Sequence, residues 1–269
     1  MTPPVVLTIA GSDSGAGAGI QADLKVFAAL RTYGTSVLTA VTAQNTRGVD
    51  GVFPLSTAAV TGQLTSVLAD FPVRAVKTGM LGTPEIASAV ADAAREGRLP
   101  NLVVDPVLVA TSGHQLGVVA AVERLLPYAE VATPNCAEAA AILGQPVTTP
   151  DEMAVAARQL ASQGPETVVV TGGDLDGREA VDALCTGDSV VLIRAPRVPT
   201  RHNHGTGCSF AAAVTVRLAL GDPAPDAVRF AKEYVTRSLA GASDWELGGG
   251  RGSLDHFGWS ESTAREAES

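Results

Sequence analysis

Basic, aromatic and sulfur-containing side chains are scarce in this sequence of 269 residues. Lysine occurs only as Lys25, Lys77 and Lys232, and the formal net charge is −9. Such a chain has no basic surface to neutralise a phosphate backbone, which argues against a nucleic-acid partner. A site that handles phosphate groups would have to rely on backbone N–H groups, arginine and a metal ion.

The three cysteines, Cys136, Cys185 and Cys208, are widely spaced and form no CxxC pair. Their odd number argues against a disulfide framework and indicates a reducing compartment. No apolar run approaches the ~18 residues that a membrane-spanning helix needs, and the first residues lack the basic start of a signal peptide. We therefore expect a cytoplasmic protein with no membrane partner.

Aromatic residues make up only 4% of the chain, whereas hydrophobic residues make up 46%, so the core must be built from Val, Leu, Ile and Ala. Short apolar runs alternate with amphipathic stretches, which predicts a mostly parallel sheet covered by helices on both faces. The predicted strands are residues 5–10, 36–41, 73–76, 102–104, 130–133 and 167–171. Helices are predicted from residue 20 to Gly34 and around 57–70, 84–96, 117–126, 136–143, 151–163, 206–220 and 224–241.

The rhythm changes after residue 179. Two β-rich runs, 180–185 and 189–193, flank the pair Gly187-Asp188 and predict a hairpin that forms an antiparallel edge. We expect residues 1–245 to form a single domain. Residues 246–269 are Gly- and Ser-rich and then charged, which predicts a tether and a loose C-terminal tail.

The glycine-rich segment 11–19 lies between a predicted strand and a predicted helix, where phosphate-binding loops occur. It matches neither the dinucleotide pattern GxGxxG nor the GxxxxGK[ST] pattern. One interpretation is a tight turn. The other is that its bare backbone lies against a ligand, with Asp23 one turn into the helix and free to accept hydrogen bonds.

A second glycine motif, Gly205-Thr206-Gly207, leads directly into an Ala-rich helix. The first N–H groups of a helix are unpaired and bind anions. Cys208 is in the first turn, where the helix dipole lowers a thiol pKa, so its thiolate could take a proton from an attacking alcohol. Alternatively, Cys208 is a small buried hydrophobic residue. His202 and His204 lack a nearby partner that would make them a metal pair.

Polar residues follow two neighbouring predicted strands. Asp105 ends the run 102–104, at the edge of a parallel sheet where ligands bind, although it could also cap the next segment. Asn135 and Glu138 are three residues apart, which fits a capping box as well as a metal site. With Asp105, Glu138 could hold Mg²⁺ through water.

Six segments occur in the order found in one kinase family: TIAGSDSGAGAGIQADLKVF, SVLTAVTAQNT, VKTGMLG, VVDPVLVATSG, TPNCAEA and HGTGC. Over residues 5–240 the chain thereby resembles the hydroxymethylpyrimidine/phosphomethylpyrimidine kinases of the ribokinase-like superfamily. The resemblance implies a three-layer α/β/α sandwich, ATP and Mg²⁺ as cofactors, a small pyrimidine as substrate, two successive phosphorylations for thiamine synthesis, and a homodimer.

The resemblance also assigns roles to residues. It implies that Cys208 is the base and that Gly205, Thr206 and Gly207 form an anion hole. Asn135 and Glu138 match the motif for Mg²⁺ and phosphates, with Asp105 beside them as a second metal-binding carboxylate. The pocket for the pyrimidine would be formed by Gly11, Asp23, Gln44, Met80 and Val107. The ATP site would include Thr171 and Gly173.

The chain departs from the family in three places. Thr111 and Thr171 stand where relatives often carry lysine, and His202-Asn203 replaces Asn-Thr before the GTG motif. Arg201 is a candidate to supply the missing positive charge. Two other interpretations stay open: a pyridoxal kinase of the same fold, and a pyrimidine-binding module without catalysis. Gln44 favours the pyrimidine because its amide has both a donor and an acceptor.

Overall fold

The computed structural model describes residues 2–108, 119, 120 and 122–260. Its elements are β1 (Val5–Asp13), α1 (Gly19–Ala29), β2 (Tyr33–Asn45), β3 (Gly48–Pro54), α2 (Thr57–Asp70), β4 (Val73–Thr78), α3 (Pro84–Arg95), β5 (Leu102–Val104), the 3₁₀ helix η1 (Leu126–Tyr128), β6 (Val131–Ala132), α5 (Cys136–Leu143), α6 (Pro150–Ala161), β7 (Thr167–Thr171), β8 (Glu179–Thr186), β9 (Ser189–Pro196), α7 (Thr206–Leu220) and α8 (Ala224–Gly241).

The described strands form one sheet in the order β3-β2-β1-β4-β5-β6-β7-β8-β9. Six neighbouring strands run parallel, namely β2, β1, β4, β5, β6 and β7. Their carboxyl ends therefore share one edge of the sheet. The predicted antiparallel edge is confirmed as β8 and β9. The opposite edge of the sheet is antiparallel as well, because β3 pairs with a β2 that is longer than predicted. The β3 sequence GVDGVFP contains two glycines and an aspartate, which have low β propensity and hid the strand.

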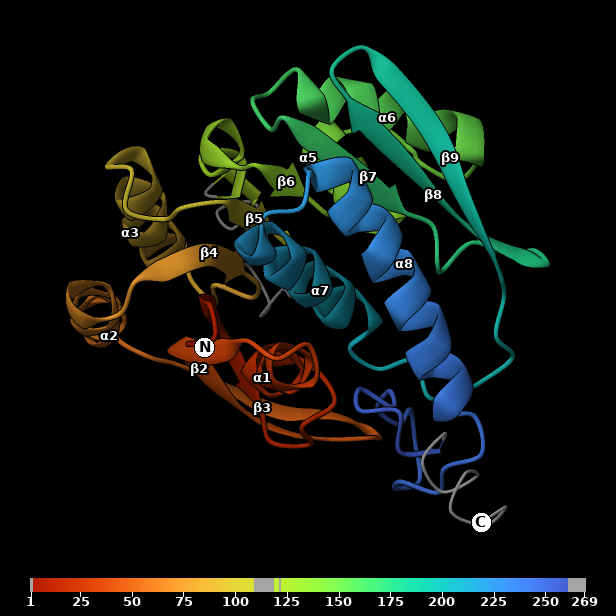
Figure 1. Ribbon diagram of the computed structural model, residues 1–269, viewed down its shortest axis with the longest axis horizontal. Helices are drawn as coiled ribbons and strands as arrows, with labels where there is room; N and C mark the ends of the chain where they lie inside the picture. The colour runs from red at the N-terminus through yellow and green to blue at the C-terminus, as the bar shows by residue number, and fades with distance from the viewer. Residues whose placement is uncertain (1, 109–118, 121, 261–269) are drawn as a thin grey trace.

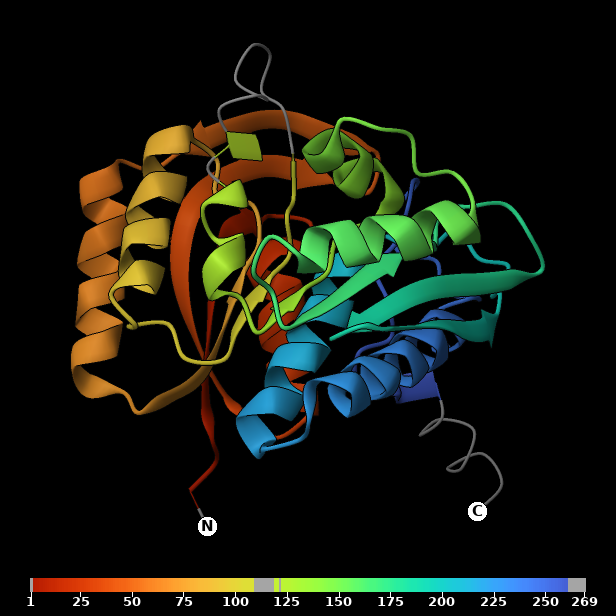
Figure 2. The same cartoon turned by 90° about the horizontal axis from the view of Figure 1, so that it is seen from above.

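Helices cover both faces of the sheet, as the three-layer prediction required (Figures 1 and 2). Alternate residues of each strand point to opposite faces. Leu7 and Ile9 of β1 therefore pack in one core with α2, α3, α5 and α6, while Val6 packs in the other with α1, α7 and α8. Among the described helices none is long and apolar enough to cross a membrane.

The Ala-rich helix α7 is the centre of its layer. It packs against α1, α8 and strands β1, β4 and β5, and nearly every side chain from Ser209 to Ala219 is buried. Small side chains allow this close contact on all sides. The packing places the first turn of α7 at the sheet edge where the parallel strands end (Figure 1).

The segment predicted to be a loose tail is packed against the protein up to residue 260. Leu254 is 1% exposed, and Asp255 and His256 are also buried. The Tyr234 hydroxyl donates to the His256 carbonyl at 2.7 Å, and Asp255 N donates to the Ser238 carbonyl at 3.0 Å. We call residues 248–256 the C-terminal strap. The glycine-rich sequence suggested flexibility because only one aliphatic residue, Leu254, anchors it.

Replacing Leu254 by alanine should lower the free energy of unfolding by about 2–4 kcal/mol, because the change leaves a cavity in the core beside α7 and α8. Urea denaturation at pH 7 measures this. The matched control is Leu247→Ala, at a side chain that is 48% exposed, where we expect a change below about 0.5 kcal/mol. Equal small effects would contradict the packed strap.

Candidate active site

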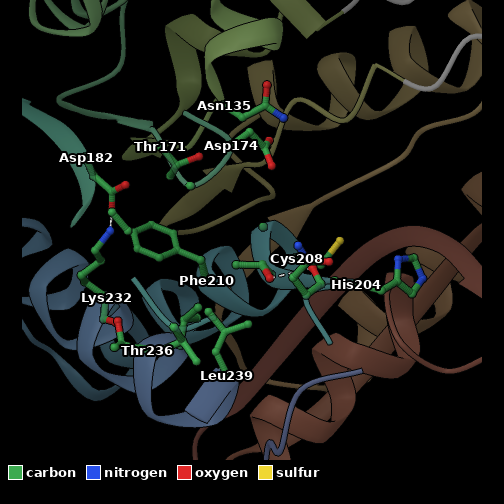
Figure 3. Close-up of a pocket in the computed structure, with 18 of the residues that line it drawn as sticks. Asn135, Thr171, Asp174, Asp182, His204, Cys208, Phe210, Lys232, Thr236 and Leu239 are labelled. Carbon is green, nitrogen blue, oxygen red and sulfur yellow. Dashed lines mark hydrogen bonds and ion pairs between the residues drawn. The ribbon is translucent and has the colours of Figure 1, made fainter. Parts of the chain in front are cut away.

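A pocket of about 500 Å³ opens at the edge where the parallel strands end. Its wall is formed by the loops after β5, β6 and β7, the first turn of α7, one face of α8 and the strap. Figure 3 shows Cys208 between two groups of side chains: Asp182 and Lys232 with Phe210, Thr236 and Leu239 to one side, and His204 to the other. The pocket therefore has two ends that meet at the start of α7.

The two glycine-rich loops pack directly against each other. A Cβ on Gly205, whose φ is +83°, would lie 1.9 Å from the Gly17 carbonyl oxygen, and one on Gly17 would lie 2.4 Å from His204 Cδ2. Gly19, with φ +57°, approaches the Gly11 carbonyl in the same way. These glycines are required by contacts between protein segments. Contacts within the protein therefore account for Gly17 and Gly19 without a ligand against the backbone.

The first turn of α7 presents unpaired amides to the pocket. The Thr206 hydroxyl donates to the Asn203 carbonyl at 2.7 Å, and Ser209 N donates to the Gly205 carbonyl at 2.9 Å. The amides of Gly207 and Cys208 have no acceptor among the described residues. Together with the positive end of the helix dipole, they make this turn suited to a phosphoryl group.

A buried ion cluster lies beneath Cys208. Lys77 Nζ is 2.9 Å from Asp23 Oδ1 and 3.3 Å from Asp105 Oδ2, and all three side chains are almost completely buried. Thr8 Oγ1 donates to Asp23 at 2.6 Å. Burial raises the pKa of Asp23 although Lys77 opposes this, and the two carboxylates raise the pKa of Lys77 against the effect of burial. Asp23 is thus fully engaged by Lys77 and Thr8, and the prediction that it is free to accept hydrogen bonds from a ligand is wrong.

Cys208 does not behave as the helix dipole alone predicts. Burial raises the pKa of its thiol to about 12; the carboxylates of Asp105 and Asp23 add to this, and Lys77 opposes it. Near neutral pH the free protein therefore holds Cys208 as a thiol, which corrects the expectation of a thiolate. Its hydrogen bond to Asp105 lowers the pKa of that carboxylate, although burial, the larger effect, raises it.

Asn135 and Glu138 form the capping box that begins α5. Glu138 N donates to Asn135 Oδ1 at 2.9 Å, and Asn135 N donates to Glu138 Oε2 at 2.8 Å. Burial, followed by the nearby charge of Asp105, raises the pKa of Glu138 to about 8, with Asp174 adding to the effect. The two predicted metal ligands are therefore close enough to repel each other, and a cation would relieve this repulsion.

On the same wall, Thr133 Oγ1 lacks a hydrogen-bond partner among the described residues, and so does Asp105 Oδ2, whose near neighbour is the Lys77 ammonium at 3.3 Å. Hard oxygen donors of this kind suit Mg²⁺, which keeps much of its water and binds few carboxylates directly. No group of three or more His, Cys, Asp or Glu side chains in the described part of the chain could hold a metal alone. The donor set fits a magnesium ion shared with a bound polyphosphate.

At one end of the pocket, His204 joins the first glycine loop to Gln44. Its Nε2 lies 2.9 Å from Asp13 Oδ2 and 3.0 Å from Gln44 Nε2. Although burial opposes the charge of Asp13, hydrogen bonds from His204 and from backbone amides lower the pKa of that carboxyl. One ring nitrogen cannot satisfy both partners fully. A ligand could therefore take over the Gln44 amide while His204 stays paired with Asp13.

At the other end, Lys232 of α8 pairs with Asp182 of β8 at 2.7 Å, and Gly172 N donates to the same aspartate at 3.1 Å. Phe210, Thr236 and Leu239 supply an apolar wall beside this pair (Figure 3). These residues were missed because they come from separate helices and strands and form no motif. Lys77 did give a signal, since a lysine within a buried strand needs charged partners.

Most of the residues singled out from the sequence meet in this pocket. Its lining includes Asp105, Val107, Asn135, Glu138, Thr171, Gly173, Gly205, Thr206, Gly207 and Cys208. Gln44 reaches it through His204. Gly11, Asp23 and Met80 are not part of the lining, and Met80 Cε lies directly over Gly11. Arg201 is exposed and outside the lining, and Thr111 lies outside the described residues.

The model of the family described as phosphomethylpyrimidine kinase matches residues 13–255. The chain belongs to this family. A hydroxymethylpyrimidine/phosphomethylpyrimidine kinase from Streptomyces coelicolor is 50% identical over 96% of both chains. A pyridoxal kinase from Staphylococcus aureus, solved with AMP-PCP and pyridoxal, has a TM-score of 0.89 and 35% identity over 96% of this chain and 95% of its own. A phosphomethylpyrimidine kinase from Clostridium difficile has a TM-score of 0.75 and 39% identity over 88% and 99%.

The raised pKa of Glu138 predicts that stability depends on pH. Glutamate ionises near 4.5 in the unfolded chain and at about 8 in the folded protein, so folding takes up a proton between these values. Thermal stability in metal-free buffer should fall as the pH rises from about 5 to about 8. Glu138→Gln should make this slope shallower, whereas the exposed Glu233→Gln should not. Parallel slopes for wild type and Glu138→Gln would contradict the prediction.

Proposed function

We propose that this protein transfers the γ-phosphoryl group of ATP to the hydroxymethyl oxygen of 4-amino-5-hydroxymethyl-2-methylpyrimidine, and then phosphorylates the monophosphate to the pyrophosphate for thiamine synthesis. One observation carries the proposal: the free amides of Gly207 and Cys208 open into a single pocket between the carboxylates at β5 and β6 and the corner at His204 and Gln44. Such amides stabilise negative charge on a group that is being transferred.

ATP fits the end of the pocket formed by β7, β8 and α8. The Staphylococcus aureus relative was solved in complex with AMP-PCP, an ATP analogue. Thr171, Gly173 and Asn135 line this end, as does Lys232 in its ion pair with Asp182. Asp105 and Glu138 would hold Mg²⁺ through water, and the ion would neutralise charge on the polyphosphate.

The acceptor fits the end of the pocket next to Gln44. The Gln44 amide matches a ring nitrogen beside an exocyclic amine, because it has both an acceptor and a donor. Val107 adds an apolar contact from the loop after β5. The alcohol would then face Cys208. Because this thiol has a pKa of about 12, its proton has to move to Asp105 before or while the sulfur accepts the proton of the alcohol. Glu138 would then be the carboxylate left to hold Mg²⁺ during the transfer.

Pyridoxal kinase is the second candidate function, because the likeness in fold to the Staphylococcus aureus enzyme covers nearly the whole chain. A coupled ATP assay with hydroxymethylpyrimidine, its monophosphate and pyridoxal in parallel tests both. We expect turnover of the two pyrimidines and a lower kcat/KM for pyridoxal. Preference for pyridoxal would replace the first proposal, and binding without ATP consumption would indicate a pyrimidine-binding module.

Replacing Cys208 by alanine should lower kcat by about 10²–10⁴-fold if the sulfur acts as a base, with a smaller change in KM. The control is Cys185→Ala, which removes a thiol buried in the core and absent from the pocket lining. Near-wild-type turnover of Cys208→Ala would remove the sulfur from this role.

The cytoplasmic location, the homodimer and a single kinase domain over residues 1–245 stay predictions from the sequence.

A further inference from the structure

Three lysine or arginine side chains of the described residues line the pocket, and two of them already bind other groups of the protein. Arg197 donates to the carbonyl oxygens of Gly173 at 2.7 Å and Gly177 at 2.9 Å, and also to that of Leu175. Lys232 pairs with Asp182. The third side chain, Arg251 of the strap, has no ion pair among the described residues.

Arg251 uses only one edge of its guanidinium group within the protein. Its Nε donates to Asn203 Oδ1 at 2.8 Å. The two terminal nitrogens have no hydrogen-bond partner in the described part of the chain, and the side chain is exposed at the pocket wall. A guanidinium held at Nε in this way keeps two parallel donors for an oxyanion.

The backbone around Arg251 is held firmly on both sides. Arg251 N donates to the Thr46 carbonyl at 2.8 Å, and Gly250 N donates to Thr46 Oγ1 at 3.1 Å. His204 N donates to the Gly252 carbonyl at 3.1 Å. A Cβ on Gly250 or on Gly252 would lie 2.0 Å from a neighbouring atom. Arg251 is therefore placed by close contacts that only glycine neighbours allow.

These contacts locate Arg251 at the acceptor end of the pocket. Thr46 is two residues beyond Gln44, and Asn203 directly precedes His204 and the amides of the first turn of α7. In Figure 3, Asp182 and Lys232 lie on the far side of Cys208 from His204. The Lys232–Asp182 pair thus lies at the ATP end, and the free guanidinium belongs to the end that receives the pyrimidine.

The two proposed reactions differ in the charge of the acceptor. The first acceptor is a neutral alcohol, whereas the second is a phosphate monoester with a charge near −2 at neutral pH. We infer that Arg251 binds the phosphate of the second acceptor and makes the site selective for that phosphomonoester. This inference rests on the proposed function.

Kinetics of both reactions with the full-length Arg251→Gln variant test the inference. We expect kcat/KM for the monophosphate, divided by kcat/KM for the alcohol, to fall about 10–100-fold, mainly through KM. Arg251→Lys should recover part of the loss, because lysine restores the charge without the two parallel donors. The matched control is Arg201→Gln, an exposed arginine outside the pocket, which should leave the ratio unchanged. An unchanged ratio in Arg251→Gln, or an equal loss in both reactions, would overturn the inference.

Calorimetric titration in the absence of nucleotide separates this inference from the proposed function. The monophosphate should bind Arg251→Gln about 10–100-fold more weakly than wild type, with little change in the affinity for the alcohol. Wild-type protein that binds the monophosphate through Arg251 but never turns it over would support the inference and refute the kinase. Equal affinity of wild type and variant, or no binding to wild type, would overturn the inference.

Discussion

The ammonium group of Lys77 lies between two buried carboxylates, and this contact fixes the position of Asp105, which lines the pocket. It joins β4, which carries Lys77, to Asp23 on α1 and to Asp105 after β5. Removing one member of such a cluster leaves an uncompensated buried charge, which typically costs about 3–5 kcal/mol. Burial is the main cause of the raised pKa of Cys208, and the cluster modifies it, because Lys77 lowers this pKa while Asp105 and Asp23 raise it. The ion cluster therefore acts on both the fold and the chemistry of the pocket.

The position of the anion-binding turn follows from close packing. Helix α7 is buried almost completely, and its N-terminal glycine touches the glycine loop after β1. Neither loop could move toward a phosphate without losing these contacts. The amides of Gly207 and Cys208 are thus held in place before any ligand arrives, which is the condition under which hydrogen-bond donors stabilise a developing charge most effectively.

Much of the fold could be predicted because its signals are local. Residue pairs such as Asn135 and Glu138 mark the start of a helix, and the ranges predicted for α2, α5, α7 and α8 agree with the structure. The features that were missed depend on distant neighbours. The pKa of Cys208 is raised by burial among groups from β4, β5 and α1, and the engagement of Asp23 depends on Lys77, which is 54 residues away. Neither the surroundings of Cys208 nor the pairing of Asp23 with Lys77 can be inferred from the spacing of residues in the sequence.

The strap is the last part of the pocket to be synthesised. All the described strands and α7 precede it in the chain, so the residues of the sheet, the ion cluster and the anion-binding turn leave the ribosome before residue 251 does. The corner at Thr46 and His204 then stays uncovered until the last segment docks. A protein truncated before Gly248 would keep the sequence of every described strand and still lack Arg251 from the lining of its pocket.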